Sequence, residues 1–223
     1  MKYRHELKQE IRYEDMLALK QRLSIVMEKD CHAVDGSYEI RSIYFDNLYD
    51  KALREKINGI NIREKFRIRY YNQNVSYIKL EKKSKINGLC QKETVPLTKE
   101  ETQDILNGNY DWMLTRKEPL LTEFYFKIKH TGLRPKTIVD YTREPYIFRP
   151  GNVRVTIDYN LRTGISCTDF LDTSCVTVPV FNHPIILEIK WDEYLPDIIK
   201  DLVQLNNGRT GAFSKYATCR MYG

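Results

Sequence analysis

Charged and apolar side chains alternate along residues 62–92, and this alternation predicts paired β-strands. From Ile62 to Tyr70 the even positions are apolar or aromatic apart from Glu64, and the odd positions are all basic. The basic residues are Arg63, Lys65, Arg67 and Arg69. Because successive side chains of a strand point to opposite faces, one face is cationic and the other apolar. Residues 78–86 repeat the pattern, with Lys79, Glu81, Lys83 and Lys85 sharing a face.

The alternation typical of strands and the 3.6-residue spacing typical of amphipathic helices predict the other elements of the chain. Asn87-Gly88 predicts a tight turn, after which Lys92 lies on a returning strand. Further strands are expected over residues 3–8, 39–45, 136–143, 153–158 and 185–190, with a weakly patterned one over 170–178. Helices are expected over residues 13–29, 50–56, 98–107 and 120–129, and from Pro196 to a stop at Asn207-Gly208. No linker rich in Pro, Gly or Ser divides the chain, so residues 1–223 are expected to form a single domain.

Composition narrows the classes of function. The net charge of +6 suggests an anionic partner but is too small to indicate DNA binding by itself. The five cysteines lack CxxC spacing, which argues against a disulfide framework and a zinc site. We see no secretory signal and no apolar run long enough for a transmembrane helix, so we expect a cytoplasmic protein; a membrane partner is possible but not encoded here. A glycine-rich phosphate loop and a GxSxG motif are also missing, so any chemistry must come from Lys, Arg and Glu.

At least five of the expected strands combine one apolar face with one ionic face. The amphipathic helices can cover the apolar faces. The ionic faces then either meet water on an open sheet or face one another inside a closed one. Like charges side by side repel, and confined charges without partners cost several kcal/mol each. A closed sheet of this composition therefore implies a strongly anionic ligand, whereas an open sheet implies only a solvated face.

Several motifs, in order along nearly the whole chain, carry a family resemblance. They are Arg4-His5-Glu6-Leu7-Lys8, Phe66-Arg67-Ile68-Arg69-Tyr70, Leu80-Glu81-Lys82-Lys83-Ser84-Lys85-Ile86-Asn87-Gly88, Arg143, Val153-Arg154-Val155-Thr156-Ile157-Asp158, Leu187-Glu188-Ile189-Lys190 and Ser214-Lys215-Tyr216. With them the chain resembles the VTC-type polyphosphate polymerase domain of the triphosphate tunnel metalloenzyme (CYTH-like) superfamily. The resemblance implies an α+β fold, a closed eight-stranded antiparallel β-barrel (the triphosphate tunnel) with flanking helices.

The resemblance also implies a metal-dependent transfer of the ATP γ-phosphate to the end of a polyphosphate chain, with release of ADP. By motif position, the residues that bind phosphate are Lys8, Arg67, Arg69, Lys83, Lys92, Arg143, Arg154, Lys190 and Lys215. Of these, the catalytic ones are Arg67, Arg69, Lys83 and Lys215. Glu188 is the first choice for a ligand of Mn²⁺ or Mg²⁺, and Glu6 and Glu81 are second choices.

The chain departs from the superfamily's pattern at one position, and the sequence leaves several functions open. Triphosphatase members of the superfamily begin with Glu-x-Glu-x-Lys, whereas Arg4 replaces the first Glu here, which favours the polymerase branch. Hydrolysis of tripolyphosphate or of an organic triphosphate is the second hypothesis. A non-catalytic binder of polyphosphate or RNA is the third, with Tyr70, Tyr71 and Tyr77 as stacking surfaces. Alternation alone leaves four cations undecided between the lumen and solvent: Arg63, Lys65, Lys79 and Lys85. Asp158 is either a metal ligand or the partner of a lumen cation.

Overall fold

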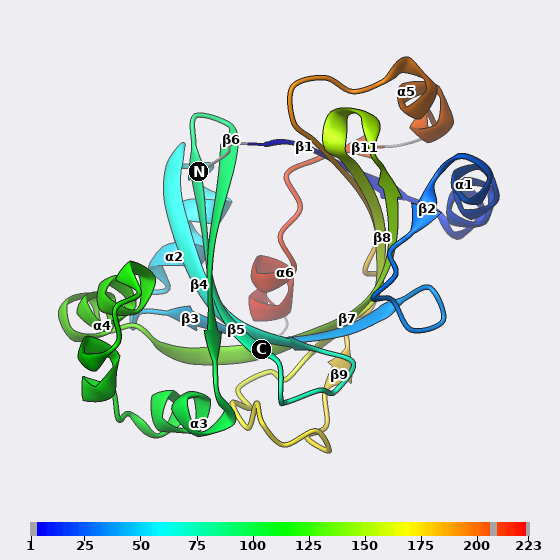
Figure 1. The fold of residues 1–223 in the computed structure, drawn as a ribbon. Coiled ribbons are helices and arrows are strands. Elements are labelled where there is room, and N and C mark those ends of the chain that lie inside the picture. The colour runs from blue at the N-terminus through cyan, green and yellow to red at the C-terminus, as the bar shows by residue number, and fades with distance from the viewer. Residues whose placement is uncertain (1–3, 206–208, 222–223) are drawn as a thin grey trace.

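The computed structural model describes residues 4–205 and 209–221. A strongly curled antiparallel sheet forms the centre of the molecule, and most helices lie on its outer side (Figure 1). Its long strands are β1 (His5–Ile11), β3 (Tyr38–Asp46), β4 (Ile62–Tyr71), β5 (Ile78–Ile86), β6 (Leu89–Leu97), β7 (Arg134–Phe148), β8 (Val153–Thr163) and β10 (Ile185–Trp191). The short strands are β2 (Glu28–Lys29), β9 (Val178–Pro179) and β11 (Arg209–Thr210). The order is β11-β1-β10-β8-β7-β3-β4-β5-β6, with β2 on β7 and β9 on β8.

The sheet is open, so the expectation of a closed eight-stranded barrel was wrong, although the α+β class and the antiparallel curl were right. Within the described residues, the only strand pairing between this end of the sheet and β6 is an isolated bridge, in which the amide of Arg4, the residue before β1, donates to the Cys90 carbonyl at 3.4 Å. A strand has two edges for pairing. One edge of β1 pairs with β10 and the other pairs with β11 through Gln9 and Thr210. The edge that would have closed the barrel against β6 is therefore partly occupied. We call the opening between β1 and the β5–β6 hairpin the seam.

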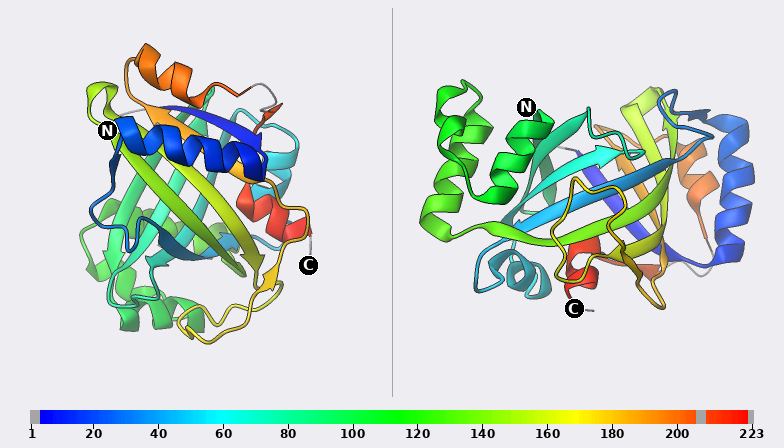
Figure 2. Two further views of the ribbon diagram at one scale, coloured as in Figure 1. Left: turned by 90° about the vertical axis from the view of Figure 1, so that its right-hand side faces the viewer. Right: turned by 90° about the horizontal axis from the view of Figure 1, so that it is seen from below.

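The apolar faces of the strands point outward and are covered by helices. On one side, Phe66, Ile68 and Leu80 pack against α3 (Lys99–Asn107), η1 (Asp111–Thr115) and α4 (Pro119–Thr131). On the opposite side, Val155, Leu187 and neighbours pack against α1 (Tyr13–Val26) and α5 (Asp197–Val203). Figure 2 shows these two helix groups on opposite flanks of the sheet. The predicted alternation on β4 and β5 is thus confirmed, except that Ile62 is exposed at the start of its strand.

The last helix, α6 (Lys215–Met221), lies inside the outline of the curled sheet rather than outside it (Figure 1). Tyr216 stacks on Tyr44 with ring centroids 5.1 Å apart, and its hydroxyl donates to buried Asp46 at 2.8 Å. Arg220 forms an ion pair at 3.0 Å with Asp50, which precedes α2 (Lys51–Ile57). These contacts hold α6 at one end of the space enclosed by the sheet. We call that space the bore.

Several local expectations need correction. Residues 170–177 form turns and irregular structure rather than a strand, and only Val178 enters a strand, β9. Arg41 donates to the carbonyls of Asp172 and Cys175 in this segment. The helix expected over residues 13–29 ends at Val26, and β2 follows it. The expected stop at Asn207-Gly208 and the first residue of the strand over 3–8 lie outside the described residues. The remaining short elements include η2 (Pro150–Asn152). None of the described helices is long and apolar enough to cross a membrane.

Candidate functional site

A strongly basic cavity of about 410 Å³ lies in the bore. Among the described residues, its wall contains eleven basic side chains and only two carboxylates. The basic residues are Arg4, Lys8, Lys65, Arg67, Arg69, Lys83, Lys92, Arg143, Arg154, Lys190 and Lys215, and the carboxylates are Glu6 and Glu188. Curling gathers these residues because alternation places every ionic face on the concave side of the sheet. We call this space the bore cavity.

Buried Glu81 organises the cations of β4 and β6. Its carboxylate lies 2.6 Å from an Arg67 amino group and 2.5 Å from Lys92 Nζ, and Arg69 approaches to 3.9 Å. Arg69 also donates to the Ser42 hydroxyl at 2.8 Å. Burial raises the pKa of Glu81, but the charges of Arg67 and Arg69 outweigh it and hold the pKa well below its usual value. The carboxylate is therefore ionised and fixes the guanidinium groups that face the cavity.

A second cluster joins β1, β5 and β10. Register pairs Lys8 with Glu188 and Glu6 with Lys190 on neighbouring strands. Lys83 Nζ lies 2.7 Å from Glu6, and Lys190 Nζ lies 3.0 Å from Glu188. Lys8 bridges the two carboxylates, at 3.1 Å from Glu6 and 3.5 Å from Glu188. These contacts show that the Glu188–Lys190 pair does form an internal salt bridge.

A third cluster lies where β7, β8 and α6 meet. Arg143 donates two hydrogen bonds to Asp158, at 2.6 and 2.7 Å, and a third to Glu188 at 3.0 Å. Lys215 Nζ lies 2.5 Å from the same Asp158, which has no exposed surface. Asp158 is therefore the partner of lumen cations, Arg143 and Lys215, and it does not line the cavity. Lys215 also lies 4.5 Å from the Tyr141 ring centroid.

Lys65 differs from the other cations of the bore cavity. Among the described residues it forms no ion pair with a carboxylate; its ammonium lies 5.5 Å from the Tyr44 ring centroid. Burial, with Lys83 and Arg67 nearby, lowers the pKa of Lys65 to about 7. Burial would raise the pKa of Tyr44, but Arg67 and Lys65 outweigh it and lower that pKa to about 7. Burial also lowers the pKa of Lys190 to about 8. The cavity thus holds more positive charge than its own carboxylates neutralise.

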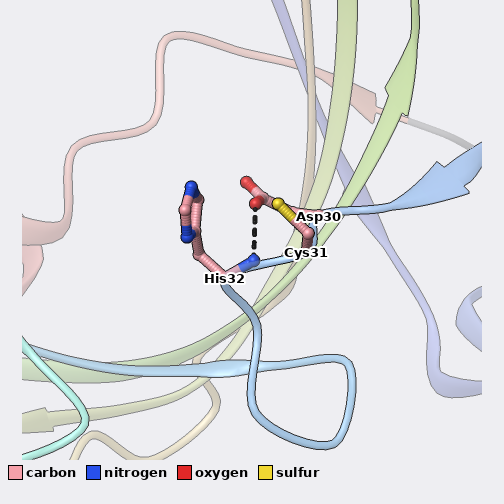
Figure 3. A group of neighbouring side chains, drawn as sticks. All are labelled: Asp30, Cys31 and His32. Atoms are coloured by element: carbon pink, nitrogen blue, oxygen red, sulfur yellow. Dashed lines mark hydrogen bonds between the residues drawn. The ribbon is translucent and has the colours of Figure 1, made fainter.

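Arg154 reaches the rim of the bore cavity, where its guanidinium lies 3.2 Å from Asp30. Asp30, Cys31 and His32 bring potential metal-ligating atoms within 4.8 Å of one another (Figure 3). The Asp30 carboxylate, however, accepts the His32 amide at 3.1 Å and contacts Arg154, while Cys31 and His32 are exposed. These contacts explain the group as a turn that holds Arg154, and we assign no metal to it.

The structure brings together nearly all of the residues that the sequence selected. Every predicted phosphate-binding residue, together with Glu6 and Glu188, lines the bore cavity, whereas Glu81 lies buried behind it. Lys65, Tyr44 and Tyr141 also line the cavity. Lys65 shares its strand face with Arg67 and Arg69, and this alternation was the available signal. The two tyrosines had no such signal.

The expected stacking surface is not formed. Tyr70 is buried on the outer side, where its hydroxyl donates to the Phe170 carbonyl at 3.1 Å. Tyr71 lines the bore cavity, and Tyr77 is exposed to solvent. Arg4, which replaces the first Glu of the triphosphatase signature, forms an ion pair with Asp192 at 2.8 Å.

Glu6 and Glu188 have the chemistry that a hard divalent cation requires. Burial raises the pKa of each carboxyl, but the surrounding lysines and Arg143 outweigh it, so both pKa values are lowered and both groups are ionised. Mg²⁺ and similar ions take one or two carboxylates together with water and substrate phosphates. Glu6 and Glu188 fit that donor set. Glu81 does not, because its oxygens face Arg67, Arg69 and Lys92.

Comparison with known proteins agrees with this geometry. Residues 3–222 match the VTC domain family. No curated protein matches the sequence. A solved structure from Hippeastrum, described as an adenylyl cyclase with a dominant triphosphatase activity, is similar over 100% of this chain and 96% of its own, with a TM-score of 0.57 and 13% identity. An adenylate cyclase-like structure from Bacillus halodurans is similar over 85% of this chain and 80% of its own, with a TM-score of 0.50 and 12% identity. These likenesses concern the fold, whereas the family match spans nearly the whole sequence: the chain belongs to the VTC domain family.

Proposed function

We propose that this protein is a metal-dependent phosphotransferase that makes polyphosphate from ATP. The γ-phosphoryl group moves to the terminal oxygen of a phosphate chain, and ADP leaves. The observation that carries this proposal is the convergence of eleven basic side chains on one cavity with two carboxylates. So dense a positive charge favours a ligand with several adjacent phosphates rather than a single anion.

The proposed chemistry needs no covalent nucleophile. The acceptor is already an oxyanion, so a general base is not essential, and the obstacle is the repulsion between two polyanions. Arg67 and Arg69 are held by Glu81 with their guanidinium groups at the cavity, where they can fork phosphate oxygens. Lys83 and Lys215 act as point charges on the transferred group. Catalysis then comes from alignment and from charges fixed before the reaction.

Glu6 and Glu188 would hold the divalent cation, Mn²⁺ or Mg²⁺. When bound, such an ion neutralises part of the charge on the nucleotide phosphates. Lys8 and Lys190 bridge the same carboxylates in this structure, at 3.0–3.5 Å for the three closest contacts. For the carboxylates to hold the cation, these ammonium groups would have to turn toward the substrate phosphates. The two lysines would then exchange carboxylate partners for phosphate partners, so no charged group would be left unpaired.

The direct test is to incubate the purified protein with ATP and Mn²⁺ and to separate the products on a gel stained for polyphosphate. Long chains together with ADP support the proposal. The same test is repeated with Arg67→Ala and Lys215→Ala, which should remove turnover while the circular dichroism spectrum is retained. Unchanged synthesis in both variants would show that the bore cavity is not the site.

Hydrolysis of a triphosphate is the second candidate, and the shared fold with the Hippeastrum protein favours it. Water would replace the chain end as acceptor in the same cavity. Orthophosphate without long chains in the gel assay would establish hydrolysis. A non-catalytic polyphosphate binder would retain tripolyphosphate but give neither product. RNA binding has less support, because Tyr70 faces the outer core rather than the cations.

A further inference from the structure

A second basic cavity, of about 340 Å³, adjoins the bore cavity at the seam. Lys65 and Lys83 belong to the walls of both cavities, as do Glu6 and Lys8. The rest of its wall comes from α2, the starts of β4 and β6, the end of β5, and residues 210–214, which lead to α6. It therefore lies where β1 and the β5–β6 hairpin no longer pair. We call it the seam cavity.

Three cations of the seam cavity, unlike Lys8 and Lys83, have no acidic partner in the described part of the chain. Among the described residues, Lys56, Arg63 and Lys85 form no ion pair with a carboxylate. Lys56 donates to the Ala212 carbonyl, and Arg63 donates to the Ile60 carbonyl. In the bore cavity, by contrast, every basic side chain except Lys65 has a carboxylate partner, as the ion pairs described above show.

The two carboxylates in the wall of the seam cavity are already engaged. Glu64 pairs with Lys127 and with Lys82, the latter at 3.4 Å. Glu6 pairs with Lys83 at 2.7 Å. The positive charge of the seam cavity is therefore not neutralised from within the described chain.

The unpaired cations lie close enough to repel one another. Burial lowers the pKa of Lys56, and the charges of Arg63, Lys8 and Lys85 lower it further. Like charges gathered in a partly enclosed space destabilise the fold unless an anion lies between them. The arrangement is thus suited to bind a polyanion.

The position of α6 restricts the path that a long polyanion can take. α6 lies at one end of the bore (Figures 1 and 2), and Tyr216 fills that end by stacking on Tyr44. A linear chain that runs from the bore cavity toward this end therefore has no straight path past α6. The seam is the lateral opening beside it, and its cations continue the row from Lys65 and Lys83 through Lys85 toward solvent.

We propose that the seam cavity binds the distal part of a polyphosphate chain whose end lies in the bore cavity, and that the chain leaves the protein through the seam. This inference rests on the proposed function for the identity of the chain. It adds a second binding segment and a direction of exit. The chain is gripped at the reacting end by paired cations and along its length by unpaired ones.

The test compares binding of tripolyphosphate and of long-chain polyphosphate without ATP or metal, so that no turnover is needed. The variant combines Lys56→Gln, Arg63→Gln and Lys85→Gln, none of which belongs to the proposed catalytic set. Loss of three charge-assisted contacts should weaken long-chain binding by about tenfold or more. Tripolyphosphate should bind within about twofold of wild type, because it fits the bore cavity alone.

A matched control removes three exposed charges elsewhere, with Arg22→Gln, Lys99→Gln and Lys117→Gln. It should leave both affinities near those of wild type. Equal affinity of the seam variant and wild type for long chains would overturn the inference, as would an equal loss for both ligands. If wild type binds long chains more tightly than tripolyphosphate but makes none from ATP, the proposed synthesis is contradicted, whereas the proposed binding at the seam cavity is still supported. Melting temperature checks folding; removing mutually repelling cations should not lower it.

Discussion

Lys82 and Lys83 are neighbours on β5 but belong to opposite faces of the sheet. Lys83 Nζ lies 2.7 Å from Glu6 at the bore cavity, whereas Lys82 Nζ lies 2.5 Å from Glu123 of α4 on the outside. This pair gives a matched test of the concave face. Lys83→Ala should reduce kcat/KM with ATP by about a hundredfold, the typical effect of one preorganised charge. Lys82→Ala should leave kcat/KM within about threefold but lower the unfolding free energy by roughly 1–3 kcal/mol, because three carboxylates lose a largely buried partner. Similar losses of kcat/KM in both variants would contradict the assignment of the concave face as the site.

Asp158 should be a stabilising residue, because of its two possible roles the structure shows that of a partner to lumen cations. Replacing it with Asn leaves Arg143 and Lys215 buried without their shared carboxylate. Removal of one partner from a buried ion pair costs roughly 3–5 kcal/mol. Urea unfolding should show a loss of that size, and tripolyphosphate should restore part of it by supplying the missing negative charge. Asp197→Asn, at a side chain that is 88% exposed, is the control and should be nearly neutral.

The sequence predicted most of the residues that line the bore cavity but did not predict that the sheet stays open. Alternation on β4 and β5 identifies Arg67 and Lys83 as members of one face, because side-chain parity is a local property of a strand. Whether the sheet closes depends on a contact between residues far apart in the chain. The pairing of Gln9 with Thr210 occupies the edge of β1 and has no local signal in either segment. Its consequence, the seam, was therefore not predicted.

The ion-pair partners across the bore could not be predicted from the sequence either, because they too depend on contacts between residues far apart in the chain. The sequence left open which lumen cation would pair with Asp158, and Arg154, four residues away on the same strand, was one candidate. Arg154 instead pairs with Asp30 from the turn after β2. Asp158 instead pairs with Arg143 and Lys215. α6 escaped prediction because seven residues carry too little periodicity. It is held by distant contacts, such as Tyr216 with Asp46.

Glu188 and Glu81 should differ in their effect on metal dependence. Glu188 lines the bore cavity, whereas Glu81 lies behind the arginines that it orients. Glu188→Gln should therefore raise the Mn²⁺ concentration needed for half-maximal activity by about tenfold or more, since a ligand is lost. Glu81→Gln should lower activity and stability with little change in that concentration. Titration of activity against Mn²⁺ checks both. A larger shift for Glu81→Gln would reverse the metal assignment.

Lys65 should make anion binding depend on pH in a predictable direction. Its pKa is about 7 in the free protein, so it gains a proton as the pH falls through 7, and the protonated form attracts phosphate. Tripolyphosphate binding should therefore weaken as pH rises above that value, by up to about tenfold per unit for one linked proton. Isothermal titration calorimetry from about one unit below to about one unit above the pKa measures this slope. In Lys65→Met combined with Tyr44→Phe the decline should begin later, near the pKa of about 8 of Lys190. The Tyr44 phenol also has a pKa of about 7, and its ionised form would repel the ligand. Tyr44→Phe removes that phenol and so shows how much of the pH dependence comes from it. The same profile in Tyr44→Phe and in the double variant would show that Lys65 does not contact the bound anion.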